Sequence, residues 1–487
     1  MKRRIALKHL GFGVTAGLAL PWLSSCIEDI KEPVINYDGV VGIIGAGAAG
    51  LYAADYLLAK GIKVKIFEAS SGMGGRVRSI RTTDPLFSSF IADFPLELGA
   101  DRIIGSDSTW GALVKLYKAP TVDFRGGTTN AVDKYILDDQ YKALLDIQAD
   151  NDFNALLNFR DTILPSYSGG GSVQAVAGLS SRVNGILNSW LGNAYGTSSD
   201  RISAQALGEA ISMIEHDGKE LTLGLNSMSN VLLSRFSKST PKVQLNSAVK
   251  SVDYSGELIT LSVQNTETLD TTTEIVGKLI VAVPVSILKA GDITFTPSLP
   301  ASKGSALGNI GMDASIRVIM EFKRNDFFGA DTAFIFGGSD APSYFVAGAG
   351  RSEANKTFSV TISGAKAEEL SEKTDLEKVQ QILAELDTAF GAPGNLASTN
   401  VRKKTDGAII YAVQNWTKEK EPFIKGGQSY PLVGGTNNDR VALAAPVGES
   451  LYFAGEATDV TGEFGTISGA LKSGRRAAEE LIASIVG

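Results

Sequence analysis

The chain has 487 residues and a formal net charge of −7, with 44% hydrophobic and 20% charged residues. A chain of this length and apolar content can bury the cores of two or three domains. Its acidic balance argues against nucleic acid as a partner, because the phosphate backbone binds basic surfaces.

The first 26 residues have the layout of a secretory signal. A basic start, MKRR, precedes an apolar stretch at residues 10–23 that is too short to cross a bilayer as a helix. RRIALK resembles the twin-arginine signal, and LSSC resembles a bacterial lipobox, whose cysteine carries the lipid. We therefore expect residues 1–26 to be a signal peptide with a lipobox, and Cys26 to be lipidated. An uncleaved anchor or a chance basic N-terminus is the alternative interpretation.

This signal leads to expectations about location and cofactor. Export should leave a membrane-anchored lipoprotein that faces the periplasm or the cell exterior, with residues 27–38 as a polar linker. Twin-arginine export carries proteins that are already folded, which predicts a tightly held cofactor. Cys26 is the only cysteine of the sequence, so no disulfide can form within one chain.

A glycine-rich turn follows the linker. Residues 40–44 form an apolar run suited to a buried parallel strand, and Gly45, Gly47 and Gly50 follow in G-x-G-x-x-G spacing before a helix. This spacing lets a pyrophosphate approach the backbone at the helix N-terminus. A second apolar run ends in Glu68, whose carboxylate can accept hydrogen bonds from ribose hydroxyls. The pattern predicts a site for NAD or FAD, against the alternative of a plain glycine-rich turn.

Later blocks of the sequence distinguish between these two nucleotides. They are SSGMGGRVRS (70–79), ELGADRIIG (97–105), KLIVAVPVSIL with ITFTPSLP (278–300), GGQSYPLVGG (426–435) and LYFAGEATDVTGEFGTISGALKSGRRAAEEL (451–481). In this order they resemble the flavin-containing amine oxidase family, which includes monoamine, polyamine and L-amino-acid oxidases. The resemblance covers about residues 40–485. It implies FAD and an α/β fold, with a Rossmann-like FAD-binding domain interleaved with an α+β substrate domain. Some relatives attach the flavin covalently through a cysteine, but the only cysteine, Cys26, is expected to carry the lipid, so the FAD should be noncovalent.

The predicted domains are discontinuous. Residues 39–105, 240–290 and 436–487 should form the FAD-binding domain, and residues 106–239 and 291–435 the substrate-binding domain. Periodicity within the second domain predicts helices at 173–191, 204–214 and 376–390 and strands at 315–322 and 356–362.

The resemblance implies a set of contacts to FAD. The residues at matching motif positions are Gly45, Gly47, Ala48, Ala49, Gly50, Glu68, Ala69, Gly74, Gly75, Arg76, Val249, Gly455, Glu456, Gly465, Thr466 and Ile467. Arg76 would neutralise the pyrophosphate, Glu456 would bind the ribityl chain, and Val249 would contact the adenine unless it is an ordinary core valine. The helix that begins at residues 465–467 would direct its positive end at the flavin, which favours the reduced form.

The resemblance also implies a reaction. A hydride passes from the carbon next to the nitrogen of an amine or amino acid to flavin N5, and water hydrolyses the resulting imine. Oxygen or another acceptor then reoxidises the flavin, and oxygen yields hydrogen peroxide. Arg317 aligns with a family lysine that holds a water at N5, although strand alternation also allows it to face solvent, opposite Ile316 and Val318. Trp416 resembles the tryptophan that walls the flavin; a core tryptophan is the alternative.

The sequence departs from the family where the substrate is recognised. Gln428 and Thr466 stand in place of two aromatic residues, Tyr430 lies two positions from the first, and Ile104 stands where polyamine-oxidising relatives often carry histidine. These four residues form the predicted substrate pocket, and no metal site is expected. His216 is predicted to be a solvated helix-end residue. A desaturase or isomerase of a lipid-like substrate and a noncatalytic flavoprotein are the alternative functions.

Overall fold

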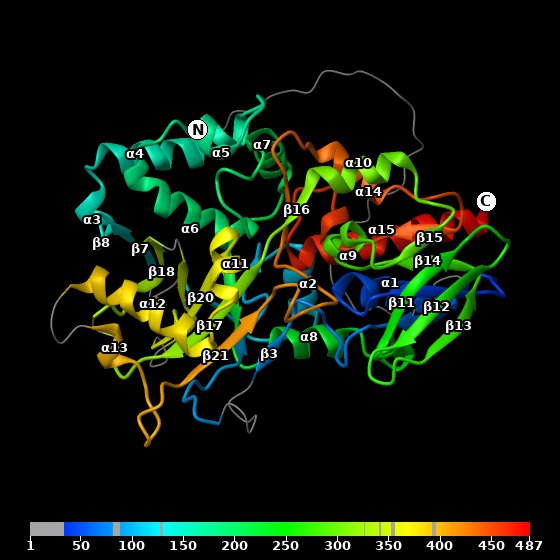
Figure 1. Cartoon of the computed structure of the whole chain (residues 1–487), viewed down its shortest axis with the longest axis horizontal. Helices are drawn as coiled ribbons and strands as arrows, with labels where there is room; N and C mark the ends of the chain where they lie inside the picture. Colours follow the sequence, from blue (N-terminus) through cyan, green and yellow to red (C-terminus); the bar gives the residue numbers. More distant parts are fainter. Residues whose placement is uncertain are drawn as a thin grey trace.

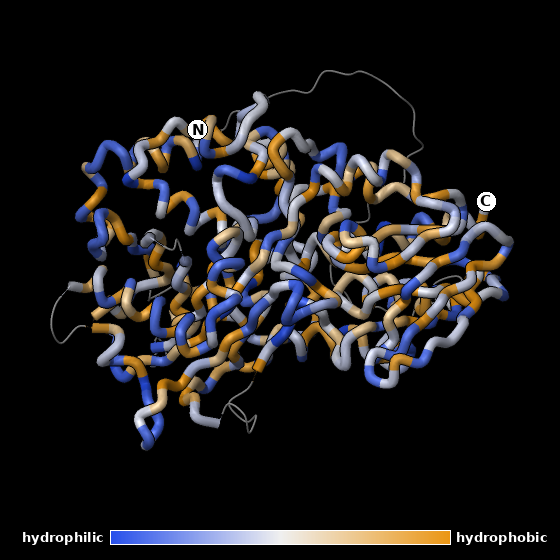
Figure 2. Tube along the Cα trace, in the orientation of Figure 1, coloured by the Kyte–Doolittle hydropathy of each residue, from blue (hydrophilic) through white to orange (hydrophobic). Residues whose placement is uncertain are grey.

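The computed structural model describes residues 34–80, 88–126, 130–325, 327–339, 342–351, 356–391 and 396–487. The predicted signal peptide, Cys26 and residues 27–33 lie outside these ranges. Two lobes lie side by side (Figure 1), and Figure 2 shows apolar residues recurring along the strands of both. Among the described helices, none has the length and hydropathy that a membrane span requires.

The first lobe is built on a parallel sheet. Its strands, in spatial order, are β10 (Val243–Gln244), β2 (Lys63–Phe67), β1 (Val40–Ile44), β14 (Lys278–Val281) and β23 (Leu451–Phe453). The helices of this layer are α1 (Ala48–Ala59) and α15 (Ile467–Val486). They pack against each other so closely that a Cβ at Gly474 would lie 2.2 Å from the carbonyl oxygen of Ala49. The apolar run of β1 is therefore covered, as a central parallel strand requires.

A second sheet packs against the first in the same lobe. Its strands, in spatial order, are β13 (Thr271–Val276), β12 (Ile259–Asn265), β11 (Ser247–Asp253) and β15 (Thr294–Thr296). Ile44 and Phe67 of the parallel sheet share a core with Val249 of β11. The Ser247 amide donates a 2.7 Å hydrogen bond to the Glu68 carbonyl, which fixes β11 at the end of β2.

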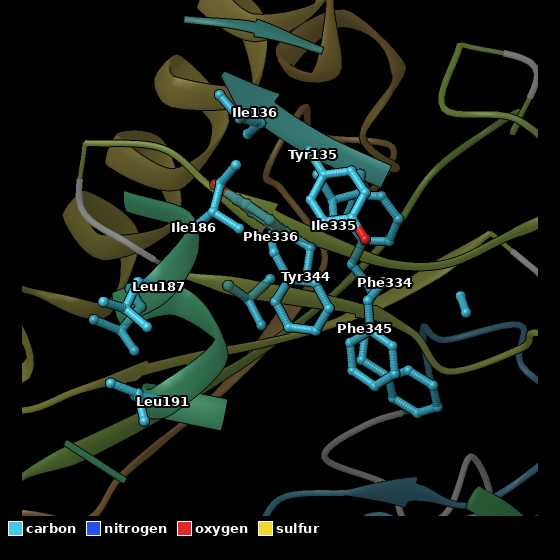
Figure 3. Packing of buried hydrophobic residues seen from close by; sticks show 14 of the residues in the cluster. Tyr135, Ile136, Ile186, Leu187, Leu191, Phe334, Ile335, Phe336, Tyr344 and Phe345 are labelled. Atoms are coloured by element: carbon cyan, nitrogen blue, oxygen red, sulfur yellow. The ribbon is translucent and has the colours of Figure 1, made fainter. Parts of the chain in front are cut away.

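The second lobe contains a seven-stranded sheet. Its strands, in spatial order, are β21 (Tyr411–Asn415), β17 (Ser315–Glu321), β20 (Thr357–Ser363), β19 (Ser343–Val346), β18 (Thr332–Gly337), β7 (Val132–Leu137) and β8 (Gln140–Ala143). The helices of the lobe are α3 (Leu144–Ile147), α4 (Asn151–Asn158), α5 (Val173–Ala177), α6 (Asn184–Tyr195), α7 (Ala204–Met213), α11 (Ala365–Ser371), α12 (Asp375–Phe390) and α13 (Ala397–Asn400). Figure 3 shows Ile186 and Leu187 of α6 beside the aromatic side chains of this sheet. Among these, Phe334 and Phe345 stack with ring centres 4.8 Å apart.

The predicted elements of this lobe are confirmed with one difference. The helices predicted at 204–214 and 376–390 are α7 and α12, and the two predicted strands are β17 and β20. The helix predicted at 173–191 is divided into α5 and α6. Gly178 ends α5 in a left-handed conformation with φ of 57°, which terminates a helix at little steric cost.

Two helices and one strand differ from the predicted domain boundaries. β15 (Thr294–Thr296) lies in the range assigned to the substrate-binding domain, but it pairs with β11 of the first lobe. α2 (Thr109–Leu116) and α8 (Met228–Arg235) fall in the range assigned to the substrate-binding domain, yet Trp110 and Val231 pack in the core that contains Val41 of β1. The physical reason is that α2 packs against α15 of the first lobe. Shorter elements are β3 (Ser79–Ile80), β4 (Leu96–Glu97), β5 (Ile103–Ile104), β6 (Thr121–Asp123), β9 (Glu220–Leu223), α9 (Val285–Ala290), α10 (Ala301–Asn309), β16 (Ile310–Met312), β22 (Ser429–Pro431) and α14 (Asn437–Ala444).

Candidate functional site

A cavity of about 480 Å³ is lined by residues of both lobes. The predicted cofactor residues that line it are Gly45, Gly47, Ala48, Ala49, Glu68, Ala69, Gly74, Gly75, Arg76, Val249, Gly455, Glu456, Gly465, Thr466 and Ile467. The predicted residues Arg317, Trp416, Gln428 and Ile104 also line it. The fold therefore brings together positions that lie more than 400 residues apart in the sequence.

The glycine-rich turn forms one wall of the cavity. A Cβ at Gly47 would meet no atom within 4 Å, so the turn leaves open space at the N-terminus of α1. Gly50 does not line the cavity, because it lies inside the turn, where a Cβ would be 2.0 Å from the carbonyl oxygen of Gly45. Open space, free backbone amides and a helix N-terminus together suit a phosphate.

Glu68 is held at the end of β2 by backbone donors. The Ala46 amide donates to one carboxylate oxygen at 2.7 Å, and the Ser70 amide donates to the other at 2.9 Å. Only 8% of Glu68 is exposed. These bonds fix the carboxylate beside the glycine-rich turn, where the sequence predicts the ribose.

Arg76 and Glu456 form an ion pair in the cavity wall. Arg76 Nη1 lies 2.8 Å from Glu456 Oε1, and Glu456 Oε2 accepts from Ser429 Oγ at 2.5 Å and from the Gly465 amide at 2.8 Å. Burial opposes ionisation of Glu456, but the charges of Arg76 and Arg440 outweigh it and hold its pKa below the usual range. Glu456 is therefore a fixed anion beside the turn that starts α15.

The N-terminus of α15 opens at the cavity. Thr466 caps the helix, because its hydroxyl oxygen accepts from the Gly469 amide at 3.0 Å and its hydroxyl donates to the Glu463 carbonyl at 2.6 Å. Gln428 Nε2 donates to the Gly465 carbonyl at 3.0 Å. Both predicted pocket residues thus line the cavity while they also stabilise the start of the helix.

Arg317 belongs to the cavity wall and not to the solvent-facing surface. Its side chain is 12% exposed, it pairs with Asp101, and it donates to Ser359 Oγ at 2.7 Å and to the Gly99 carbonyl at 3.1 Å. The alternative in which Arg317 faces solvent is therefore wrong. Its neighbours in β17, including Ile316, point into the core on the opposite face.

The positive charge of Arg317 is balanced by a buried network. Asp101 also pairs with Arg102 at 3.1 Å, and Arg102 contacts Glu220 at 2.7 Å. Arg125 contacts that same Glu220 at 2.6 Å. Burial would raise the pKa of Asp101, but the two adjacent arginines lower it, so Asp101 is a fixed anion.

Trp416 forms another part of the wall. Its indole Nε1 donates to the Leu98 carbonyl at 3.1 Å, and the guanidinium carbon of Arg78 lies 4.8 Å from its ring centre. Trp416 is 4% exposed and lines the cavity. It is therefore both well packed and accessible from the cavity, so the two interpretations of its role do not exclude each other.

The prediction that Tyr430 belongs to the substrate pocket is wrong. Tyr430 lies in β22, is fully buried, and donates its hydroxyl to Asp313 Oδ1 at 2.8 Å. β22 pairs with β16, and the ring packs over Gly311, where a Cβ would lie 2.4 Å from Tyr430 Cζ. The strand pairing directs the ring into the protein and away from the cavity.

The prediction that His216 is a solvated helix-end residue is also wrong. His216 follows α7, is 10% exposed and lines the cavity, with Nε2 3.8 Å from Glu463 Oε1. A Cβ at Gly105 would lie 2.4 Å from His216 Cγ, so this glycine makes room for the ring. Sequence reasoning also missed Asp101 and Arg102, although both lie in the ELGADRIIG block.

A partly buried carboxyl group lies close behind this wall, in a small pocket that Asp101 also lines. Glu97 of β4 accepts from Ser79 Oγ and from the Met228 amide, and burial raises its pKa to about 8 from an ordinary value of 4.5. The folded protein thus binds more protons than the unfolded chain between about pH 4.5 and pH 8. The free energy of unfolding should fall as pH rises through this window.

We expect Glu97→Gln to flatten this pH dependence. The wild-type free energy of unfolding should fall by up to about 1.4 kcal/mol per pH unit from this group, and the neutral amide cannot contribute that slope. Urea unfolding of both proteins at pH 6, 7 and 8 measures the difference. Parallel pH profiles for the two proteins would show that Glu97 ionises normally in the fold.

Comparisons with known proteins identify the family. The fold and the cavity define a two-domain α/β flavoprotein of the amine oxidase type. The family model described as flavin containing amine oxidoreductase matches residues 48–482, so the chain belongs to this family. Its cofactor is FAD. The open turn at Gly47, the ion pair at Arg76 and the N-terminus of α15 are where the phosphates and the flavin would be held.

Individual relatives are distant. The chain is 26% identical to "Lysine-specific histone demethylase 2" of Homo sapiens, over 95% of this chain and 55% of that protein. It is 28% identical to "Polyamine oxidase 4" of Oryza sativa subsp. japonica, over 41% of this chain and 38% of that protein. The chain thus spans about half the length, or less, of the curated relatives it matches.

Solved structures share the fold. Cyclohexylamine oxidase from Brevibacterium oxydans IH-35A superposes with a TM-score of 0.71 at 19% identity, over 93% of this chain and 100% of that chain. A variant of putrescine oxidase superposes with a TM-score of 0.70 at 20% identity, over 91% of this chain and 99% of that chain. Groups of three or more potential metal ligands were not found among the described residues.

Proposed function

We propose that this chain uses FAD to oxidise a small amine or amino-acid-like substrate, with molecular oxygen or another compound as the electron acceptor. One observation carries the proposal: the glycine-rich turn, Trp416, Arg317 and the N-terminus of α15 line one cavity. Relatives whose names refer to cyclohexylamine, putrescine and polyamines support an amine as the substrate class.

The residues of the chain would supply orientation and electrostatics. Bound FAD supplies the acceptor for the hydride that leaves the carbon next to nitrogen. Arg76 would neutralise the charge of the phosphates, and the positive N-terminus of α15 would stabilise the negative charge that the flavin acquires. Arg317 is held by Asp101, Ser359 and Gly99, so its position needs little reorganisation during the reaction.

The charge balance of the wall bears on the substrate. A lone arginine would repel a protonated amine, but Asp101 neutralises Arg317, and Glu220 balances Arg102. Because these two arginine charges are balanced, the wall can accept a cationic amine, and an amino acid can bring its own carboxylate. Both substrate types remain within the proposal.

A desaturase or isomerase of a lipid-like substrate is the second candidate. The observation that favours it is that Gln428 and Thr466 replace the two aromatic residues of the family. These two side chains instead form hydrogen bonds at the start of α15. A noncatalytic flavoprotein is the third possibility.

Anaerobic flavin bleaching tests these candidates together. The holoprotein is mixed without oxygen with amines, amino acids and lipid-like donors, and peroxide is measured after air is admitted. Bleaching by an amine followed by peroxide supports the proposal. Bleaching only by a lipid-like donor supports the desaturase, and a flavin that stays oxidised with all donors supports the noncatalytic alternative.

We further propose that the protein is exported as a lipoprotein anchored to the membrane through Cys26. The coincidence of RRIALK with LSSC in the first 26 residues supports this proposal. Export by this route would require FAD to be bound before the chain crosses the membrane.

We expect Arg3→Lys with Arg4→Lys to retain flavin-loaded precursor in the cytoplasm, and Cys26→Ala to release the protein from the membrane fraction. Cell fractionation with a flavin spectrum measures both, and wild-type cells are the control. Equal amounts of membrane-bound protein in all three strains would contradict the lipoprotein assignment.

A further inference from the structure

A buried arginine lies behind the cavity wall. Arg440 of α14 is 2% exposed. Its Nη1 donates to Ser429 Oγ and to the Ala457 carbonyl, both at 3.0 Å. Its Nε and Nη2 have no hydrogen-bond partner in the part of the chain that the structure describes. Burying a cation with free donors costs free energy, which points to a functional role for this charge.

Arg440 is connected to the flavin site through one hydroxyl. Ser429 Oγ accepts from Arg440 and donates to Glu456 Oε2 at 2.5 Å. Glu456 also pairs with Arg76 on the cavity side at 2.8 Å. The carboxylate of Glu456 thus lies between two arginines, one at the cavity and one behind it. This group of three carries one net positive charge.

Arg440 also supports the turn that starts α15. Its guanidinium carbon lies 3.9 Å from the ring centre of Phe464, the residue before Gly465 and the helix cap Thr466. A cation in this position adds to the positive end of the helix. Arg440 therefore packs against the turn at Phe464 and also connects, through Ser429, to the carboxylate of Glu456.

Other carboxylates near Arg440 are occupied elsewhere. Asp459 accepts from the amides of Thr461 and Glu463 at 3.1 Å and 2.8 Å. Asp439, next to Arg440 in α14, accepts from the Thr436 amide at 2.8 Å. No carboxylate of the described residues lies within ion-pair distance of the Arg440 guanidinium. Among the carboxylates that interact with its charge, Glu456, which it reaches through Ser429, contributes most, ahead of Asp459 and Asp439.

We propose that Arg440 is a positioning residue of the flavin site: it orients Glu456 through Ser429, supports the Phe464–Thr466 turn, and supplies the positive charge that favours reduction of the bound flavin. A fixed cation in a water-excluded site stabilises the negative charge that develops on reduction. The inference rests on FAD as the cofactor and does not depend on which donor reduces it.

The test is the flavin midpoint potential of the holoprotein, measured against a reference dye without any amine. At a fixed solution potential, Arg440→Met should lower the ratio of reduced to oxidised flavin by about tenfold. This corresponds to a midpoint potential that is lower by about 30 mV for a two-electron couple. Arg440→Lys keeps the charge and should retain most of that ratio. Arg475→Met is the matched control, because it removes an arginine that is 42% exposed in α15 and should leave the potential unchanged.

Ser429→Ala separates positioning from charge. It breaks the link between Arg440 and Glu456 but keeps both charges, so FAD should bind about tenfold more weakly, while the potential changes less than in Arg440→Met. A wild-type potential in folded Arg440→Met, or wild-type FAD affinity in Ser429→Ala, overturns the corresponding half of the proposal. If Arg440→Met does not fold, Arg440→Gln removes the charge instead, and a wild-type potential in Arg440→Gln overturns the charge half of the proposal. Amine-dependent bleaching is a separate measurement, so failure here leaves the proposed reaction untouched.

Discussion

Gly47→Val should yield folded protein without FAD. A Cβ at Gly47 would touch no protein atom within 4 Å, so the turn can accept the side chain. The added methyl groups would then occupy the space at the N-terminus of α1 that the pyrophosphate needs. We expect loss of the yellow flavin spectrum, with far-UV circular dichroism like that of wild-type apoprotein.

Two other glycines provide controls for this experiment. Gly72 is exposed and does not line the cavity, and a Cβ there would meet no atom within 4 Å, so Gly72→Val should keep FAD. Gly50→Ala should disturb the fold itself, because its Cβ would lie 2.0 Å from the Gly45 carbonyl oxygen. A full flavin spectrum in Gly47→Val would refute the cofactor site assigned to this turn.

Arg317→Met should bind FAD normally but be reduced by substrate at least about a hundredfold more slowly, the scale seen when one preorganised electrostatic group is lost. Among the described residues, the substitution leaves Asp101 with Arg102 as its one ion-pair partner, so the cavity wall gains one net negative charge. That negative charge repels the negative charge that forms on the flavin during reduction, so it disfavours the reaction. Stopped-flow reduction without oxygen measures the rate.

The double variant Arg317→Met with Asp101→Asn is the internal control. It removes both charges of the pair and should recover part of the lost rate, because the uncompensated anion is gone. Arg317→Lys retains the charge but not the planar fork, and should keep part of the rate. A wild-type rate of flavin reduction in Arg317→Met would show that Arg317 has only a structural role in the cavity wall.

The cofactor site could be predicted where its chemistry is local in sequence. The turn at Gly45–Gly50 and the carboxylate of Glu68 follow from the spacing of a strand, a helix and a strand, and the structure places them around one open space. The same holds for Thr466, since a helix cap is a local feature.

Residues that depend on distant partners could not be predicted in this way. His216 turns into the cavity because Gly105, more than 100 residues earlier, leaves room for its ring. Tyr430 turns away because β22 pairs with β16. The positive charge of Arg317 is balanced by Asp101, 216 residues away, and nothing near Arg440 in the sequence signals its burial behind Glu456.

The most direct test of the central claim is flavin reduction by an amine labelled with deuterium on the carbon next to nitrogen. The holoprotein is mixed anaerobically with the labelled and the unlabelled amine, and the flavin absorbance is followed in time. The proposed function predicts bleaching by both, with slower bleaching by the labelled amine because that carbon–hydrogen bond breaks during reduction. A flavin that stays oxidised with every amine, yet is bleached by a compound that is dehydrogenated at a carbon–carbon bond, would contradict it.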